Sequence, residues 1–209
     1  RERPSWDAAC TEGYDGGVVE YDLIVECGEV VNLVTIAGDD PDDPDIVCDN
    51  ALCDLQIEGT GADPRATIVV MHGLGADGTD FAPLVQEIDL ADVGPVRWLF
   101  PNAPELPVTI NGGYVMPAWF DIRHDRSDED EAGLRRSQAS IEALLAQEQA
   151  RGMPSQRIVL GGFSQGCAMA LLTGLRHAQR LAGVIGMSGY LPLAGKLAAE
   201  RSAANQYVP

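Results

Sequence analysis

The sequence G-F-S-Q-G at residues 162–166 constrains the fold more than any other stretch of the chain. An apolar run at residues 157–161 precedes it, and a helix-forming run at residues 167–172 follows it. A strand that turns this sharply into a helix strains the backbone and leaves no room for side chains beside the central residue. Glycines at positions 162 and 166 meet that requirement. The pattern predicts a strand-turn-helix unit that presents the Ser164 hydroxyl above the end of a β-sheet.

A second motif, H-G-L-G at residues 72–75, ends the β-prone run T-I-V-V-M. An exposed nucleophilic serine needs backbone N–H groups to hold the oxyanion that it creates. One comes from the residue after the serine and one from an early strand-to-helix loop. Gln165 and Leu74 occupy these positions. On the pentapeptide alone, Ser164 could instead be a simple helix cap, and the H-G-L-G motif favours the nucleophile.

Two further segments lie between these motifs: F-P-N-A-P at residues 100–104 and M-P-A-W-F-D at residues 116–121. A long predicted helix with an acidic start follows and ends near residues 152–154. The H-G-L-G turn, these two segments, the helix and G-F-S-Q-G thus form five motifs in sequence order. Over roughly residues 55–209 the sequence resembles the carboxylesterase, phospholipase and acyl-protein thioesterase family of serine α/β-hydrolases. The resemblance implies hydrolysis of carboxylic esters or thioesters, including acyl chains, by a Ser-His-Asp triad without metal or organic cofactor. By similarity Ser164 is the nucleophile, and Leu74 and Gln165 supply the oxyanion-hole N–H groups.

The order of predicted elements agrees with an α/β-hydrolase. Strands are expected at residues 67–71, 96–100, 157–161 and 182–188, and helices at residues 79–88, 128–151 and 165–177. Strands that alternate with helices predict a mainly parallel sheet with helices on both faces. Met116, Trp119 and Phe120 could line an acyl pocket or could pack a loop against the sheet, and the two uses are compatible.

The expected triad is incomplete. In this fold the acid and then the histidine follow the serine, but after Ser164 the chain has one glutamate, Glu200, and one histidine, His177, in the reverse order. On one continuous helix His177 would lie roughly 20 Å from the serine. His72 precedes the serine and is expected to brace its loop, and His124 is expected to be a solvated loop residue. None of them completes the triad.

The ends of the chain suggest why the triad is incomplete. The first residue is Arg1, and N-Q-Y-V-P at residues 205–209 resembles the start of the strand before the family's catalytic acid. We expect a truncated domain that lacks its last strands, its acid and its histidine, and that is inactive or weak by itself. The alternative is a non-catalytic α/β-hydrolase-like binding protein in which acid and base are truly absent.

The first part of the chain differs from the rest. Residues 1–60 hold 16 acidic and 2 basic side chains, a net charge of −14 out of −18. This step predicts a boundary between an acidic segment of unknown role at residues 1–54, partly extended or disordered, and an incomplete esterase domain at residues 55–209. Residues 18–26 and 30–36 are β-prone and could form a hairpin. A calcium loop at residues 38–45 and a zinc site at Cys48 and Cys53 are disfavoured, because prolines interrupt the first and no second close ligand pair accompanies the second.

Composition limits the remaining function classes. A chain of 209 residues with 45% hydrophobic side chains can bury one α/β core. It has no apolar run long enough to span a membrane and no recognisable signal peptide, which favours the cytoplasm and excludes stable membrane insertion. The net charge of −18 argues against nucleic-acid binding. The expected partner is a small ester or acyl-chain substrate, and a homodimer is compatible with the sequence.

Overall fold

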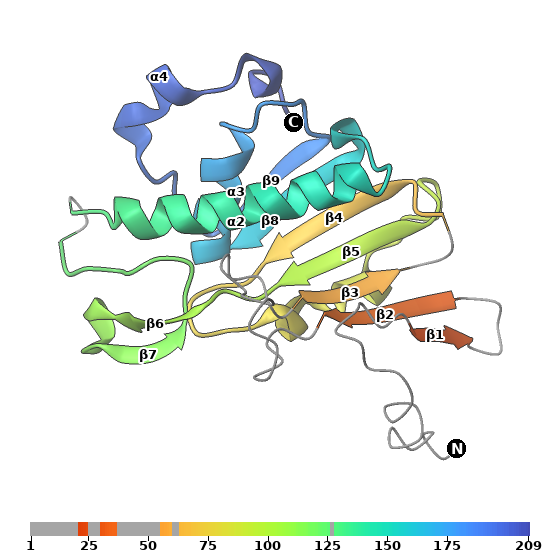
Figure 1. Ribbon diagram of the computed structural model, residues 1–209, viewed down its shortest axis with the longest axis horizontal. Helices are drawn as coiled ribbons and strands as arrows, with labels where there is room; N and C mark the ends of the chain where they lie inside the picture. Colours follow the sequence, from red (N-terminus) through yellow and green to blue (C-terminus); the bar gives the residue numbers. More distant parts are fainter. Residues whose placement is uncertain (1–20, 25–29, 37–54, 60–62, 126–127) are drawn as a thin grey trace.

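The computed structural model describes residues 21–24, 30–36, 55–59, 63–125 and 128–209. Its centre is a seven-stranded sheet with the order β1-β2-β3-β5-β4-β8-β9 (Figure 1). The strands are β1 (Tyr21–Ile24), β2 (Val30–Ile36), β3 (Leu55–Gly59), β4 (Ala66–Met71), β5 (Val96–Pro101), β8 (Ile158–Phe163) and β9 (Gly183–Met187). Strands β5, β4, β8 and β9 run parallel, and β1, β2 and β3 add to the β5 edge in antiparallel register. The predicted mainly parallel α/β sheet is confirmed.

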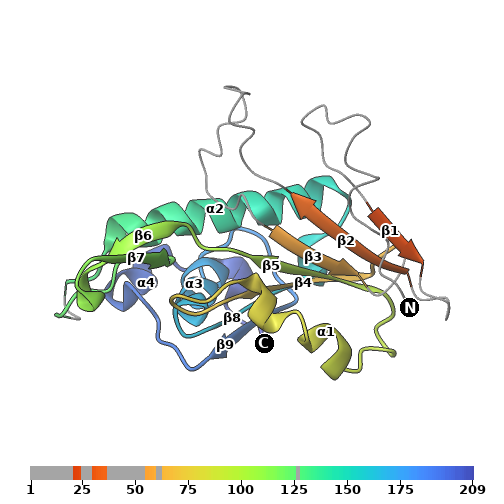
Figure 2. The same ribbon diagram turned by 90° about the horizontal axis from the view of Figure 1, so that it is seen from below.

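Helices cover the two faces unequally. The long helix α2 (Glu131–Ala150) and the helix α3 (Gln165–Gly174) pack on one face, and a 3₁₀ turn at Gly78–Phe81 and the short α1 (Leu84–Glu87) lie on the other (Figure 2). The α2 and α3 face encloses the larger core, which includes Leu134, Ile141, Leu160 and Met169. Aromatic side chains dominate the smaller core, where Trp98 and Phe100 stack at 6.0 Å.

Several predicted helix bounds were wrong. The expected helix at residues 79–88 is broken into two short pieces, because Pro83 lacks an N–H and starts a new turn as the N-cap of α1. The long helix begins at Glu131 rather than at residue 128, since the Asp130 side chain caps it by accepting from Gly133 N. The helix α3 ends at Gly174, so His177 is not on it.

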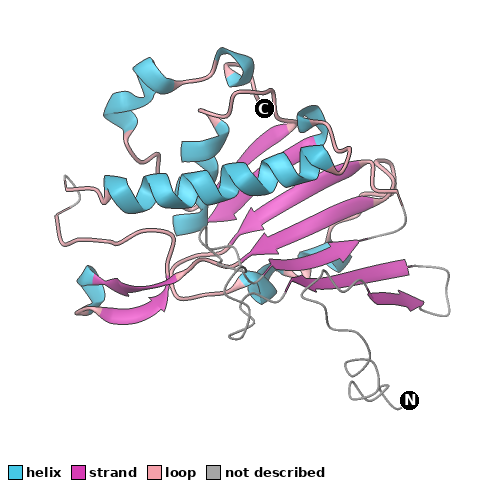
Figure 3. Cartoon of the chain, viewed as in Figure 1, coloured by secondary structure: helices cyan, strands magenta, loops and turns pink. Residues whose placement is uncertain are grey.

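A small hairpin projects from the main sheet and was not predicted. It consists of β6 (Glu105–Val108) and β7 (Tyr114–Pro117), drawn in magenta at one end of the molecule in Figure 3. Gly112 and Gly113 turn its tip with φ of 68° and 81°, a conformation that glycine adopts without strain. The hairpin returns the chain to the M-P-A-W-F-D segment beside the site.

The last residues lie against strand β9. After α4 (Leu197–Glu200), the Asn205 side chain accepts from Leu181 N and donates to His177 O. The carbonyl oxygen of Pro209 then accepts a hydrogen bond from Val184 N at 2.9 Å. The tail therefore reaches the outer edge of β9, although residues 205–209 do not form a strand.

The first part of the chain can be compared with its predictions only in places. The antiparallel pairing of β1 with β2, with Tyr21 opposite Leu33, confirms the predicted hairpin. The disfavoured calcium loop at residues 38–45 and the cysteines 48 and 53 lie outside the described residues. Within the described part of the chain, no helix is long and apolar enough to cross a membrane.

Candidate active site

Ser164 occupies the sharp turn between β8 and α3. Its backbone has φ 55° and ψ −112°, which is strained for a residue with a side chain. Two backbone hydrogen bonds hold it there: Ser164 N donates to Met187 O at 2.9 Å, and Ala168 N donates to Ser164 O at 3.2 Å. A strained, half-buried serine fixed in this way is what the sequence motif predicts.

The flanking glycines are required by close backbone contacts. A Cβ atom on Gly162 would lie 2.3 Å from the carbonyl carbon and oxygen of Gly166. One on Gly166 would lie 2.1 Å from Met71 O, the last residue of β4. Neither contact is sterically acceptable, so β4, β8 and α3 can approach this closely only without side chains at these positions. The sharp turn from β8 through Ser164 into α3, called the elbow below, therefore depends on both glycines.

The H-G-L-G turn lies directly beside the serine. A Cβ atom on Gly73 would be 3.3 Å from the Cβ of Ser164, and Gly75, with φ 72°, donates its N–H to Pro117 O at 2.8 Å. Leu74 lies between these two glycines. Gln165 is the first residue of α3, where N–H groups have no partner within the helix. Both predicted oxyanion donors thus belong to segments that border Ser164.

His72 is fully buried and braces this turn. Its Nε2 accepts from Ala103 N at 2.9 Å, which leaves the proton on Nδ1, and Nδ1 donates to Gly73 O at 2.8 Å. Burial lowers the pKa of the imidazole, so it stays neutral near pH 7. Because both ring nitrogens are engaged with backbone groups, His72 has no nitrogen left to accept the serine proton.

Comparison with known proteins agrees with this geometry. A family model described as phospholipase/carboxylesterase matches residues 53–209. The chain belongs to the phospholipase/carboxylesterase family. Its solved relatives in this family of serine α/β-hydrolases include Zea mays acyl-protein thioesterase 2, at 31% identity and a TM-score of 0.58 over 69% of this chain and 66% of that one. Arabidopsis thaliana SOBER1 superposes with 30% identity and a TM-score of 0.63 over 67% and 69% of the two chains.

Relatives known by sequence are acyl-protein thioesterases. The acyl-protein thioesterase 1 of Schizosaccharomyces pombe is 43% identical over 146 residues, which is 69% of this chain and 64% of that protein. The protein of the same name from Yarrowia lipolytica is 38% identical over 148 residues, 69% of this chain and 65% of that protein. The chain thus spans just under two thirds of the length of these two relatives.

Sequence reasoning missed the side-chain role of Gln165 in this family member. Its amide is buried: Oε1 accepts from Trp119 N at 2.9 Å, and Nε2 donates to Phe120 O at 2.8 Å. The residue proposed to offer an oxyanion N–H therefore also ties the M-P-A-W-F-D segment to the elbow. Trp119 Nε1 in turn donates to His72 O at 3.0 Å, which joins the three motifs in one network.

The three predicted substrate-contact residues lie in different places. Phe120 borders a pocket of about 620 Å³ that opens in front of Ser164. Met116 lies near the H-G-L-G turn, because a Cβ on Gly75 would be 3.5 Å from its sulfur. Trp119 is 1% exposed and belongs to the core. Contact with substrate stays a prediction for all three.

His177 lies at the far end of strand β8. Its Nδ1 is 2.6 Å from Glu142 Oε2, and its Nε2 is 3.4 Å from the Oγ of Ser155, which precedes the strand. Ser164 follows the strand's last residue, and a six-residue strand is roughly 20 Å long. The prediction of one continuous helix over residues 165–177 was wrong. The length of β8 nevertheless gives a similar separation between His177 and Ser164, which again excludes His177 as the base.

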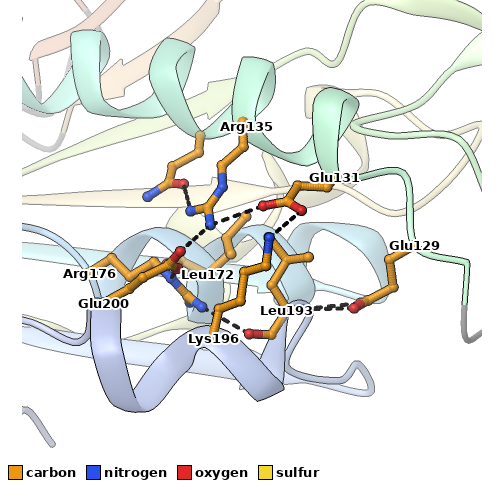
Figure 4. Close-up of polar contacts among 9 residues, drawn as sticks. Glu129, Glu131, Arg135, Leu172, Arg176, Leu193, Lys196 and Glu200 are labelled. Atoms are coloured by element: carbon orange, nitrogen blue, oxygen red, sulfur yellow. Dashed lines mark hydrogen bonds and ion pairs between the residues drawn. The ribbon is translucent and has the colours of Figure 1, made fainter.

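Glu200, the one acidic residue after Ser164, is engaged elsewhere. Its carboxylate accepts from Arg135 at 2.6 Å and from Arg176 at 2.7 Å (Figure 4). These hydrogen bonds lower its pKa to about 2. Glu200 thus ties α4 to α2 and to the turn after α3, and no histidine is among its partners in the described structure.

Proposed function

We propose that the protein is a serine hydrolase that cleaves carboxylic esters or thioesters through an acyl-serine intermediate. The observation that carries this proposal is the conformation of Ser164, which is held at φ 55° in a sharp turn between Gly162 and Gly166. Ser164 also lines a pocket of about 620 Å³. The phospholipase/carboxylesterase family and the names of the relatives, acyl-protein thioesterases, support ester and thioester substrates for this chain. Short-chain esters, lysophospholipids and acyl thioesters are the candidate substrate classes.

The proposed chemistry has two halves. The Ser164 hydroxyl oxygen attacks the substrate carbonyl carbon, and the backbone N–H groups of Leu74 and Gln165 stabilise the resulting oxyanion. Collapse of this intermediate breaks the bond to the alcohol or thiol and leaves an acyl-serine. Water then attacks the acyl group, releases the carboxylic acid and restores the serine. No step needs a metal or an organic cofactor.

Each half also needs a base that takes a proton and returns it. His72 and His177 have their ring nitrogens engaged away from Ser164, and His124 is exposed and is not part of the pocket lining. We therefore propose, as the sequence suggested, that the acid and histidine follow Pro209 and that residues 1–209 alone are weakly active. Removing a triad member typically leaves a rate ~10³–10⁴ times that in water. The cytoplasm remains the predicted compartment.

A fluorophosphonate probe tests the nucleophile. It should label Ser164 in the chain that includes whatever residues its gene encodes after Pro209, and Ser164→Ala should abolish labelling. Ser188 lines the same pocket, so Ser188→Ala is the matched control and should still be labelled. Labelling that survives Ser164→Ala would refute the assignment, and no labelling of any form would favour a non-catalytic binding protein.

A further inference from the structure

The pocket in front of Ser164 carries a strongly uneven charge. One wall comes from the residues before α2, and the opposite wall comes from the loop after β9. Among the described residues that line the pocket, Arg123 is the one cation, and the carboxylates are those of Asp121, Asp125, Asp128, Glu129 and Asp130. The part of the lining that the structure describes therefore holds five negative side chains and one positive side chain.

Arg123 cannot balance this charge. It lies 2.8 Å from Asp128 and 3.6 Å from Asp121, so its one charge is shared between two carboxylates. Burial raises the pKa of Asp121, but hydrogen bonds from Thr109 and Arg123 outweigh it and bring the pKa below its ordinary value. Asp121 is therefore ionised near neutral pH, and the pocket keeps a negative excess.

Within the described residues, two other carboxylates accept their hydrogen bonds from neutral backbone groups. Glu129 accepts from Leu193 N at 3.0 and 3.2 Å, which ties the two walls of the pocket together (Figure 4). Asp130 accepts from the backbone N–H groups of Asp121 and Gly133. Hydrogen bonds from neutral N–H groups stabilise a carboxylate without cancelling its charge. The negative potential of the wall therefore persists.

An aromatic ring completes the lining on the opposite wall. Tyr190 is 49% exposed and borders the same pocket. The face of an aromatic ring attracts ammonium groups, and combined with carboxylates it favours an organic cation. Among the described residues, no group of three histidine, cysteine, aspartate or glutamate side chains is arranged to hold a metal ion. The pocket therefore fits an organic cation better than a bound metal.

We propose that this pocket selects esters and thioesters whose leaving group carries a positive charge close to the scissile bond. The inference rests on the proposed function, since it assigns the leaving group to the pocket that Ser164 faces. Walls of one charge sign focus the field inside a pocket and raise the local concentration of the opposite charge. A cationic alcohol or thiol gains from this field before and during acyl transfer, and an anionic one is repelled.

Two butyrate esters of nearly equal shape provide the test. Butyrylcholine carries a quaternary ammonium group, and 3,3-dimethylbutyl butyrate replaces its nitrogen with carbon. We expect kcat/KM for the cationic ester to be about tenfold higher at low salt, and the preference to shrink at about 0.5 M salt, where charges are screened beyond a few ångströms. Equal values for the two esters at low salt would overturn the proposal.

Variants locate the source of the preference. Glu129→Gln should lower the ratio of the two kcat/KM values about threefold, the effect of one charge roughly 10 Å away in a partly screened pocket. Tyr190→Leu should lower it as well, and Tyr190→Phe should keep it. Asp92→Asn is the matched control, because it removes one exposed carboxylate beside the start of β5 and should leave the ratio unchanged.

Binding to Ser164→Ala separates this inference from the proposed function. That variant should bind butyrylcholine more tightly than the neutral ester in calorimetry, and Glu129→Gln in the same background should weaken only the cationic ligand. This result would support the cation-selective pocket even if no ester were hydrolysed. Equal affinity for both ligands would overturn it even if Ser164 proved to be the nucleophile.

Discussion

At the scale of single residues, the site depends on what is absent as much as on what is present. The missing side chains at Gly162 and Gly166 let β4, β8 and α3 meet at backbone distance, which forces Ser164 into its strained conformation. The same contact brings the H-G-L-G turn beside the serine. The strain at Ser164 is therefore maintained by the packing of its neighbours, which fits the role proposed for this serine.

Gly166→Ala tests this packing. The new methyl would meet Met71 O at 2.1 Å and His72 O at 2.7 Å, both backbone atoms that cannot move without shifting β4. We expect a loss of about 3 kcal/mol in the free energy of unfolding, measured in urea. Gly195→Ala is the control, since nothing lies within 4 Å of its added methyl, and it should change stability by less than about 0.5 kcal/mol. If the two variants lost the same stability, α3 could move away from β4 without a measurable cost.

His72 should make stability depend on pH. Burial lowers its pKa in the folded protein below the value of 6.5 for a free histidine, so the unfolded chain binds the proton more readily. Its contribution is therefore complete above pH 6.5 and is lost as the pH falls from 6.5 toward the lower folded pKa. Unfolding in urea between about pH 7 and 5.5 should show this slope, and His72→Gln should flatten it. An unchanged slope in His72→Gln would contradict the assignment.

At the scale of elements, the strand positions predicted from the sequence were accurate where an apolar run is short and has clear ends. Strands β4 and β5 lie within one residue of their predicted positions, because continuous β-branched and aromatic residues leave little alternative. Helix ends were less predictable, since Pro83 and the Asp130 cap act locally against the wider apolar pattern. The β6–β7 hairpin carries prolines that hide its strand character.

Long-range side-chain contacts could not be predicted at all. The Gln165 amide reaches Trp119 and Phe120 across 46 and 45 residues of sequence, and His177 reaches Glu142 across 35. No local pattern encodes such a pairing, because it exists only once the sheet has brought distant segments together. The strand-turn-helix unit at Ser164 was predictable because its glycines and flanking elements are adjacent in the chain. The residues that support it were not.

The α4 segment is held by charge rather than by a buried face. None of its residues is buried, and Glu200 links it to Arg135 and Arg176, while Lys196 pairs with Glu131. Glu200→Gln should speed amide hydrogen exchange at residues 197–205 and leave α2 unaffected. Because the Glu200 pKa falls from 4.5 to about 2, the wild-type protection should be complete above pH 4.5 and lost as the pH falls toward 2. Glu87→Gln, in α1, is the control; unchanged exchange would show that other contacts hold α4.

At the scale of the whole molecule, one sheet joins the acidic first part of the chain to the family domain. Strand β2 pairs with β3, with Ile36 opposite Leu55, and β3 pairs with β5. The family match begins at residue 53, close to the predicted boundary, yet the hydrogen-bonded sheet continues across it. The site lies at the ends of β4 and β8, with β3 and β5 between it and the added strands. The boundary in sequence is thus not a break in the sheet.

Removing residues 1–54 therefore separates two roles of that segment. The shortened chain should keep fluorophosphonate labelling of Ser164 at the rate of the parent, because none of the contacts described around the elbow involves the removed residues. It should also self-associate, since β3 would become an edge strand with unpaired backbone groups. Size-exclusion chromatography at several concentrations measures the second effect independently of the first. A large loss of labelling in a chain that stays monomeric would show that the acidic segment acts on the site itself, and a monomeric chain with full labelling would show that β3 needs no partner strand.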